Sequence, residues 1–229
     1  MDISFLIPTI RPHDKFLNVV LSNIRSIPTK YSYEICVYGP EKPKDDKVVW
    51  FEEKERTGQL YGFNHMAKNC SGEYLAVLVD DHIMLNSIDL SIDFLNSDFF
   101  KNRKYKITSL NPGDTVCNPI RGQIMGDVPI DFDIDRFPIC RFPVIDRQTF
   151  HLLGDVIFND MLKSHAGDNF LGGFLFKKGE VCIDGPTQIR AFNPQKFSEN
   201  EIFDCNIVRK LWKKLYENPD LPYNYVLEE

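Results

Sequence analysis

The sequence predicts an α/β fold with a mostly parallel central sheet and helices on both faces, in a single domain spanning residues 1–229. Over residues 1–85, short runs that are apolar throughout alternate with segments whose apolar residues recur at helical spacing. Strands of this kind are buried on both faces, and their alternation with helices is typical of a parallel sheet. A chain of 229 residues, 43% of them hydrophobic, can bury a substantial core.

The first half of the chain supplies the elements of such a sheet in order. Residues 3–7 (ISFLI) predict a strand closed by Pro8, and 12–27 predict a helix from the spacing of their apolar residues. The elements expected next are buried strands at 33–39 and 48–53, a helix over 57–71 and a fourth strand within 72–81. This half is Rossmann-like in plan. The first strand is not followed by GxGxxG, which excludes a dinucleotide-binding fingerprint. The sequence also has no GxxxxGK followed by Ser or Thr, which excludes a P-loop.

The second half loses this alternation. We expect a helix over 87–101 and a strand at 106–110, followed by a long segment at 111–140 that is rich in Gly, Pro and Asp. Such a segment inside a compact domain is more often a functional loop system than a structural one. The elements expected after it are a strand at 141–147, helices at 148–154 and 167–179, a strand at 181–185 and an amphipathic helix over 201–219.

Charge and hydropathy limit the classes of partner. The net charge of −6 disfavours nucleic acid, which is bound through clustered Lys and Arg. No apolar stretch approaches the roughly 18–20 residues needed to span a bilayer. The N-terminus, MDISFLIPTIRP, lacks the features of a signal peptide, so we expect a cytoplasmic protein. The helix over 201–219 packs on the domain in the simpler interpretation, and peripheral membrane or partner contact through its basic face is the alternative.

The cysteines show no metal or disulfide spacing. There is no CxxC pair, and several thiols lie inside apolar stretches, where a thiol behaves as a small core residue. We therefore interpret them as core residues of a protein in a reducing compartment rather than as zinc ligands or disulfides. The six positions are Cys36, Cys70, Cys117, Cys140, Cys182 and Cys205.

Two adjacent acids, Asp80 and Asp81, end the apolar run GEYLAVLV. Ligands of open α/β sheets bind beyond the carboxyl ends of the strands, so we expect this pair to meet residues 8–9 and 39–41 in one crevice. Neighbouring carboxylates repel unless a cation lies near them, and hard oxygen ligands suit Mg²⁺ or Mn²⁺. The pair predicts a divalent metal ion that also binds the phosphates of a ligand. The alternative is a solvated acidic turn.

A set of short motifs occurs in a fixed order between about residue 3 and about residue 185. They are ISFLIPT, YEICVYG, Gly58 with Asn64 and Ala67, GEYL at 72–75, VDDH at 79–82, and the downstream blocks RFPVIDR, LLG, GDNFL and KKG. Each motif alone is a weak signal, but their order and spacing together are specific. In this order and spacing they resemble the family 2 glycosyltransferases of the GT-A fold.

The resemblance implies a metal-dependent, hexosyltransferase-like enzyme of glycan or polysaccharide biosynthesis, with a nucleotide-binding half (1–85), an acceptor and catalytic half (86–185) and a helical tail (186–229). It would move a sugar from a nucleotide-sugar donor, UDP-sugar favoured, to a glycan or other hydroxyl acceptor. An inverting reaction is favoured and a retaining one stays open. Asp168 would be the general base and Asp81 the ligand of Mn²⁺ or Mg²⁺. The nucleotide-sugar contacts would be Pro8, Thr9, Arg11, Gly39, Glu41, Arg56, Gly58, Asn64 and Asp80.

Several of these roles have alternatives. His82 and His165 are further candidate metal ligands, although a lone His beside a motif is more often a hydrogen-bonding neighbour. An Asp at a helix start, such as Asp168, is often an N-cap. Arg56 could equally belong to a solvated charged loop.

The sequence departs from the family pattern at three places. YGPE offers Glu41 where the second strand usually ends in an Asp that holds the base, GD replaces the ED pair before the catalytic helix, and the DxD motif is compressed. These departures keep a catalytically silent nucleotide- or glycan-binding module open as an alternative. A sugar-nucleotidyltransferase is the second alternative, but PTIRPHDK lacks the GxGxR expected after its first strand.

Overall fold

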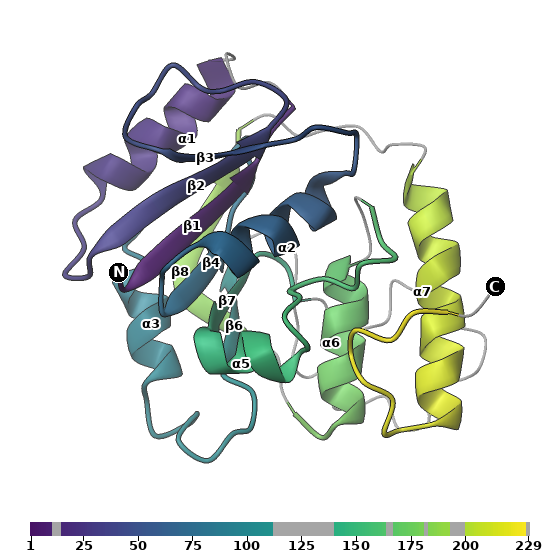
Figure 1. Ribbon diagram of the computed structural model, residues 1–229. Helices are drawn as coiled ribbons and strands as arrows, with labels where there is room; N and C mark the ends of the chain where they lie inside the picture. Colours follow the sequence, from purple (N-terminus) through teal and green to yellow (C-terminus); the bar gives the residue numbers. More distant parts are fainter. Residues whose placement is uncertain (11–14, 112–139, 164–166, 181–182, 193–199, 228–229) are drawn as a thin grey trace.

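The computed structural model describes residues 1–10, 15–111, 140–163, 167–180, 183–192 and 200–227 (Figure 1). Eight strands in this part of the chain form one sheet with the order β3-β2-β1-β4-β7-β6-β8-β5. The strands are β1 (Ile3–Pro8), β2 (Tyr33–Gly39), β3 (Val49–Glu52), β4 (Tyr74–Val77), β5 (His82–Met84), β6 (Ile107–Asn111), β7 (Pro143–Asp146) and β8 (Ile183–Ala191). The helices are α1 (Lys15–Ser26), α2 (Gln59–Asn69), α3 (Asp89–Leu95), α5 (Arg147–Leu152), α6 (Gly167–Lys177) and α7 (Asn200–Glu217).

The predicted parallel half of the sheet is confirmed. β1 is parallel to β2 on one side and to β4 on the other, and β3 continues the parallel order beyond β2. β7 then runs antiparallel to both of its neighbours, β4 and β6, while β6 and β8 are parallel. The sheet as a whole is therefore mostly parallel, and all four strands of the first half present their carboxyl ends at the same edge.

Side chains alternate between two cores along the central strands. Phe5 and Ile7 of β1 join the core under α1 and α3, whereas Leu6 joins the larger core under α2, α6 and α7. All three side chains are at most 1% exposed. This burial on both faces explains why the runs that predicted strands are apolar throughout.

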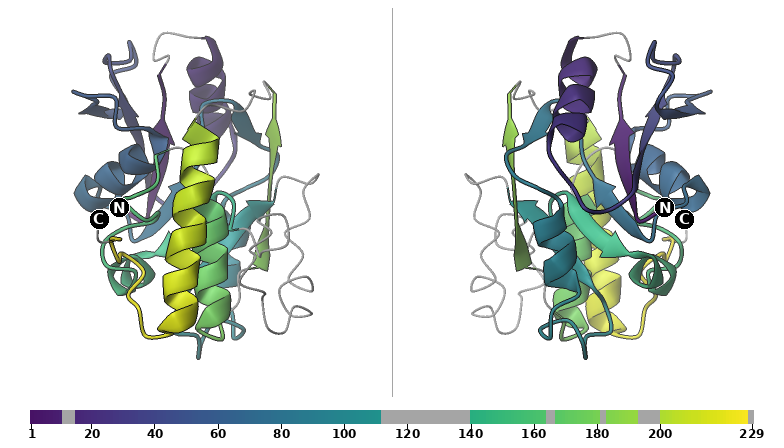
Figure 2. Two further views of the ribbon diagram at one scale, coloured as in Figure 1. Left: turned by 90° about the vertical axis from the view of Figure 1, so that its right-hand side faces the viewer. Right: turned by 90° about the vertical axis from the view of Figure 1, so that its left-hand side faces the viewer.

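The predicted packing of the C-terminal helix on the domain is confirmed. α6 and α7 lie side by side (Figure 2), and α7 buries Val208, Leu211, Trp212 and Leu215. Gly173 of α6 permits the close approach, because a Cβ there would lie 2.7 Å from the Trp212 ring.

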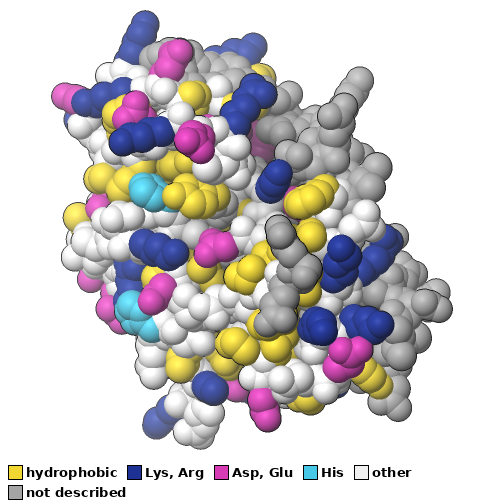
Figure 3. All heavy atoms as spheres, turned by 45° about the vertical axis from the view of Figure 1, so that its right-hand side comes forward, with side chains coloured by type: hydrophobic (Ala, Val, Ile, Leu, Met, Phe, Trp, Pro, Cys, Tyr) yellow, Lys and Arg dark blue, Asp and Glu magenta, His cyan; other side chains and the backbone are white. Residues whose placement is uncertain are grey.

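The opposite face of α7 is basic. A groove of about 390 Å³ is lined there by Lys210, Lys213, Lys214 and Glu217 together with the apolar Met161, Ile207 and Leu227. Figure 3 shows Lys and Arg side chains beside apolar ones on this side of the molecule. Membrane contact through this face stays a prediction. None of the helices in the described part of the chain is long and apolar enough to cross a bilayer.

Three predicted elements differ from the structure, and one strand was not predicted. The strand predicted as buried at 48–53 is the edge strand β3, and Val49 and Glu52 at its ends are exposed because no further strand covers that edge. The helix expected over 87–101 is only α3, since the chain turns at Asn96 and Ser97, whose side chains favour turns. β5 was not predicted, because its three residues are too few to show a period. The strand expected at 181–185 extends through Pro186 to Ala191, where the pairing with β6 shifts register.

Candidate functional site

The carboxyl ends of β1 and β4 bring Thr9 and Asp80 into direct contact. The Leu78 N–H donates to the Leu6 carbonyl (3.0 Å), which keeps the chain beside β1 beyond the end of β4. The Thr9 hydroxyl then donates to Asp80 Oδ2 at 2.6 Å. Both residues are only 5% exposed. The two strand ends expected to share a crevice therefore meet through a buried hydrogen bond.

The end of β2 joins the same place through its backbone. The Thr9 N–H donates to the Tyr38 carbonyl at 2.8 Å. A Cβ on Gly39 would lie 2.5 Å from the Thr9 carbonyl oxygen, closer than real Cβ contacts allow. Glycine is therefore required at this position by the approach of the two chains, whatever it also contributes to a ligand.

Asp81 directly precedes β5, and its backbone is fixed by the pairing of β5 with β8. Its carbonyl accepts a hydrogen bond from the Phe192 N–H (3.0 Å), and His82 pairs with Ala191 of β8. The Asp81 carboxylate is 4% exposed, and its Oδ1 lies 2.6 Å from His82 Nδ1. The alternative interpretation of the acid pair as a solvated turn is therefore wrong, because both carboxylates are buried.

Two buried carboxylates in sequence suit a divalent ion. Burying a carboxylate is unfavourable unless it is hydrogen-bonded or its charge is compensated. Among the described residues, no three His, Cys, Asp or Glu side chains at this edge bring their ligand atoms together. Mg²⁺ and similar ions are often bound by one or two carboxylates, with substrate phosphates and water completing the shell. The residues present fit an ion that arrives with a diphosphate, and His82 lies where it can orient the Asp81 carboxylate.

Asp168 lies in the first turn of α6, where part of its side chain remains accessible. Its Oδ1 accepts a hydrogen bond from the Asn169 N–H (2.9 Å), and its Oδ2 lies 3.7 Å from Arg141 Nε. The side chain is 26% exposed. One oxygen thus serves the helix start, while the other faces a guanidinium on the segment that leads into β7.

Arg141 and its neighbour Phe142 connect Asp168 to the acid pair. The Phe142 ring lies 4.7 Å from the His82 ring, centre to centre. Phe142 also has a φ of 47°, which is unusual for a residue with a Cβ. Strained backbone of this kind tends to occur at functional sites. Both residues belong to the RFPVIDR run, which predicted a strand and gave no sign of a contact with Asp168 or His82.

Asn64 and Gly58 have structural partners that the sequence did not reveal. Asn64 is 1% exposed, and its amide makes four hydrogen bonds of 2.6–3.0 Å to the segment from Ile157 to Asp160. This exhausts the capacity of the amide, so Asn64 fixes the fold rather than contacting a nucleotide. Gly58 has a φ of 94°, and a Cβ there would lie 2.3 Å from the Lys163 carbonyl oxygen.

The remaining predicted site residues are not brought to the acid pair by any described contact. Pro8 is buried as the last residue of β1, and Glu41 and Arg56 are exposed in the loops that follow β2 and precede α2. Arg11 and His165 lie outside the described residues.

Replacing Asn64 tests its structural role. We expect Asn64→Ala to lower the free energy of unfolding by about 2–4 kcal/mol, because it leaves buried backbone groups of Ile157 and Phe158 without partners. Asn69→Ala, at an exposed position of the same helix, should change it by less than about 0.5 kcal/mol. Urea unfolding of both variants measures the difference, and equal effects would contradict the assignment.

Comparison with known proteins identifies the fold. At the sequence level, neither a protein-family model nor a curated protein matches this chain. Among solved structures, S. aureus TarS in complex with UDP-GlcNAc superposes with a TM-score of 0.64 at 15% identity, over 97% of this chain and 68% of TarS. The TarS complex with UDP gives a TM-score of 0.62 at 16% identity, over the same shares.

A second protein shares this architecture. The mannosyltransferase PcManGT from Pyrobaculum calidifontis, in complex with GDP-Man and Mn²⁺, gives a TM-score of 0.54 at 16% identity, over 80% of this chain and 54% of that one. These similarities establish a GT-A-like glycosyltransferase fold, as the sequence predicted.

Proposed function

We propose that this chain transfers a sugar from a nucleotide-sugar donor to an acceptor hydroxyl, with a divalent ion bound at Asp81. The observation that carries the proposal is the pair of buried carboxylates, Asp80 and Asp81, at the carboxyl end of β4 in a GT-A-like fold. Thr9 meets this pair from β1. Buried acids held in place by hydrogen bonds, at the edge where open sheets bind ligands, are typical of a binding site rather than of a core.

The donor end of the site is assigned to Thr9, Asp80 and Asp81. Asp80, oriented by the Thr9 hydroxyl, contacts the ribose or the diphosphate. Asp81, oriented by His82, holds Mn²⁺ or Mg²⁺. When bound, such an ion neutralises the negative charge that develops on the departing diphosphate. The chain's own contribution is to hold both carboxylates fixed before the donor arrives, so that no reorganisation is needed during the reaction.

The acceptor end of the site is assigned to Asp168. A carboxylate placed beside the acceptor can take the proton of the attacking hydroxyl. Arg141, 3.7 Å away, orients it from the side of β7. An attack assisted from the face opposite the diphosphate inverts the anomeric centre, which makes an inverting reaction the favoured outcome.

A UDP-sugar is the favoured donor. The structural neighbours include a protein solved with UDP and with UDP-GlcNAc and another solved with GDP-Man and Mn²⁺. Glu41 follows β2 at the position where the family usually has an Asp that holds the base. The exposed Glu41 can approach the uracil edge when the donor is bound, and we assign it this role.

A panel of nucleotides tests the proposal. The melting temperature should be measured with UDP, GDP, dTDP and CMP compounds, each with and without Mn²⁺. A ligand at about 100 times its Kd stabilises the native state by about 2.7 kcal/mol, which corresponds to a rise of about 5–10 °C for a chain of this size. We expect one nucleotide, UDP, to give this rise only with Mn²⁺. The absence of any metal-dependent shift would contradict the proposal.

The silent binding module is the second candidate, favoured by GD in place of ED before α6. Such a module would show the same stabilisation without turnover. Release of UDP from the donor in the presence of Mn²⁺ excludes it, whether the sugar passes to an acceptor or to water.

A further inference from the structure

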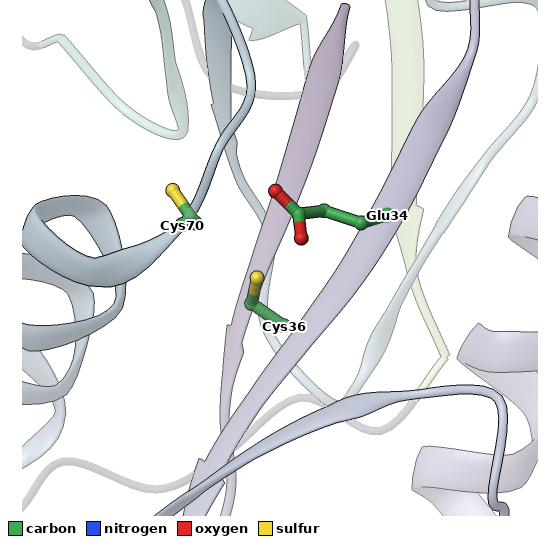
Figure 4. Close-up of side chains that lie close together, drawn as sticks. All are labelled: Glu34, Cys36 and Cys70. Atoms are coloured by element: carbon green, nitrogen blue, oxygen red, sulfur yellow. The ribbon is translucent and has the colours of Figure 1, made fainter. Parts of the chain in front are cut away.

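Two cysteines and a glutamate lie close together beside β2 (Figure 4). They lie toward the amino ends of the strands, away from the acid pair at the carboxyl ends. Glu34 and Cys36 are two residues apart on β2, so they project from the same face of that strand. Cys70 is the residue that follows the last turn of α2, and its side chain lies beside theirs. The two sulfur atoms and a carboxylate oxygen all lie within 4.8 Å of one another. The two thiols thus lie near each other although 33 residues separate them in the sequence.

The two thiols differ in access and in electrostatic surroundings. Cys36 is fully buried, whereas Cys70 is partly exposed. Arg147 Nη2 lies 3.4 Å from Cys70 Sγ, and the same guanidinium binds the carbonyl oxygens of Ala67, Cys70 and Gly72 at the end of α2. These contacts place a cation beside Cys70 and also neutralise the negative end of the helix.

The surroundings shift the pKa values of the two thiols in opposite directions. The hydrogen bond from Cys36, with a further contribution from Arg147, lowers the pKa of Cys70 to about 6. The same hydrogen bond, together with burial and the nearby Glu34 carboxylate, raises the pKa of Cys36. These directions favour Cys70, the accessible thiol beside Arg147, as the more readily ionised of the two.

A metal ion fits this cluster poorly. Glu34 Oε1 already accepts hydrogen bonds from the Ser4 hydroxyl and from the Ser71 N–H and hydroxyl, at 2.7–2.8 Å. The Arg147 guanidinium beside Cys70 would also repel a cation. The surroundings favour an anionic sulfur that reacts over one that binds an ion.

We propose that Cys70 and Cys36 form a reversible dithiol–disulfide pair that is oxidised by peroxides. The Cys70 thiolate attacks one peroxide oxygen: the S–O bond forms, the O–O bond breaks, and the other oxygen leaves as hydroxide. Cys36 sulfur then attacks the Cys70 sulfenic acid: the S–S bond forms, the S–O bond breaks, and the second hydroxide takes the Cys36 proton. Two thiols are oxidised to one disulfide, and one hydrogen peroxide is reduced to two waters once the first hydroxide is protonated by solvent.

Peroxide treatment of the intact protein tests the pair. The reduced protein should be exposed to hydrogen peroxide, alkylated, digested and mapped by mass spectrometry. We expect a Cys36–Cys70 linked peptide, lighter by two hydrogen atoms and restored by dithiothreitol. We also expect Cys70 to react at least about tenfold faster than Cys140, a buried control cysteine. The alkylation rate of Cys70 should rise through about pH 6 and then level off, because only the thiolate reacts. The titratable and charged groups around Cys70 are Cys36, Glu34 and Arg147.

Variants separate the two steps. In Cys36→Ser the reaction should stop at the Cys70 sulfenic acid, which dimedone traps, whereas Cys140→Ser should form the disulfide normally. The disulfide mapping uses the wild-type protein, so its result does not depend on whether a variant folds. Peroxide oxidation of Cys140 as fast as Cys70, or failure to form the linked peptide, would overturn the proposal. Retention of one equivalent of Zn²⁺ that is lost in Cys70→Ser would also overturn it, in favour of a metal site.

Discussion

Asp81→Asn is expected to abolish the Mn²⁺-dependent stabilisation by the nucleotide and to lower the transfer rate at least about 10²-fold. An amide is nearly isosteric with the carboxylate and can keep the hydrogen bond to His82, so the fold is preserved. It carries no charge, however, and is a weak ligand for a hard divalent ion. The variant thus removes the proposed ion ligand while leaving the backbone pairing of β5 with β8 intact.

The stability of the ligand-free variant provides an independent readout. Removing a buried charge that lacks its ion should leave the melting temperature unchanged or raise it. Isothermal titration with Mn²⁺ and UDP, together with a donor-hydrolysis assay, measures the loss of function. A variant that melts normally and still binds UDP more tightly with Mn²⁺ than without it would show that Asp81 is not the ligand.

The chain contains a matched control for this experiment. Asp155 Oδ1 lies 2.6 Å from His151 Nδ1, the same separation as in the Asp81–His82 pair, but the Asp155 side chain is 57% exposed and lies after α5. Its φ of 61° is tolerated by Asn, so Asp155→Asn is structurally compatible. We expect it to leave nucleotide binding and transfer unchanged.

The parts of the fold that the sequence predicted are those with a strong local signal. β1, β2 and β4 are buried on both faces, and this burial is written into the chain as continuous apolar runs. β8 was predicted only at its start, because Gly185 and Pro186 interrupt its sequence, and β5 has only three residues. The rest of β8 and all of β5 are strands through their pairing with each other and with β6, which is a tertiary property.

The candidate site divides in the same way. Thr9, Asp80 and Asp81 could be predicted because they follow strands whose ends must meet in a parallel sheet. Arg141 could not, since its relation to Asp168 depends on how the segment before β7 packs against α6. Asn64 looked like a motif residue, but its partners lie 93 to 96 residues away along the chain. The cysteines were correctly interpreted as core residues at Cys36 and Cys140, yet the proximity of Cys36 to Cys70 has no signature in the sequence.

Asp168→Asn is expected to separate catalysis from binding. The amide cannot accept the proton of the attacking hydroxyl, and loss of a general base lowers the rate by about 10²–10⁴-fold. Donor binding should be unchanged, because Thr9, Asp80 and Asp81 come from strand ends on the other side of the Arg141–Phe142 segment. The measurement is the rate of UDP release with a saturating donor, beside the UDP-induced rise in melting temperature.

A control is needed to separate the effect of Asp168 on the stability of α6 from its effect on catalysis. A carboxylate in the first turn stabilises a helix by about 0.3–1 kcal/mol, so Asp168→Asn could act through stability alone. Asp89→Asn removes an equivalent charge from the first turn of α3, where Asp89 accepts hydrogen bonds from the Thr29 hydroxyl and the Lys30 N–H. Similar losses of stability in the two variants, with loss of turnover only in Asp168→Asn, identify Asp168 as the base. Full turnover in Asp168→Asn would assign the proton transfer to another group and leave Asp168 as a residue that only starts α6.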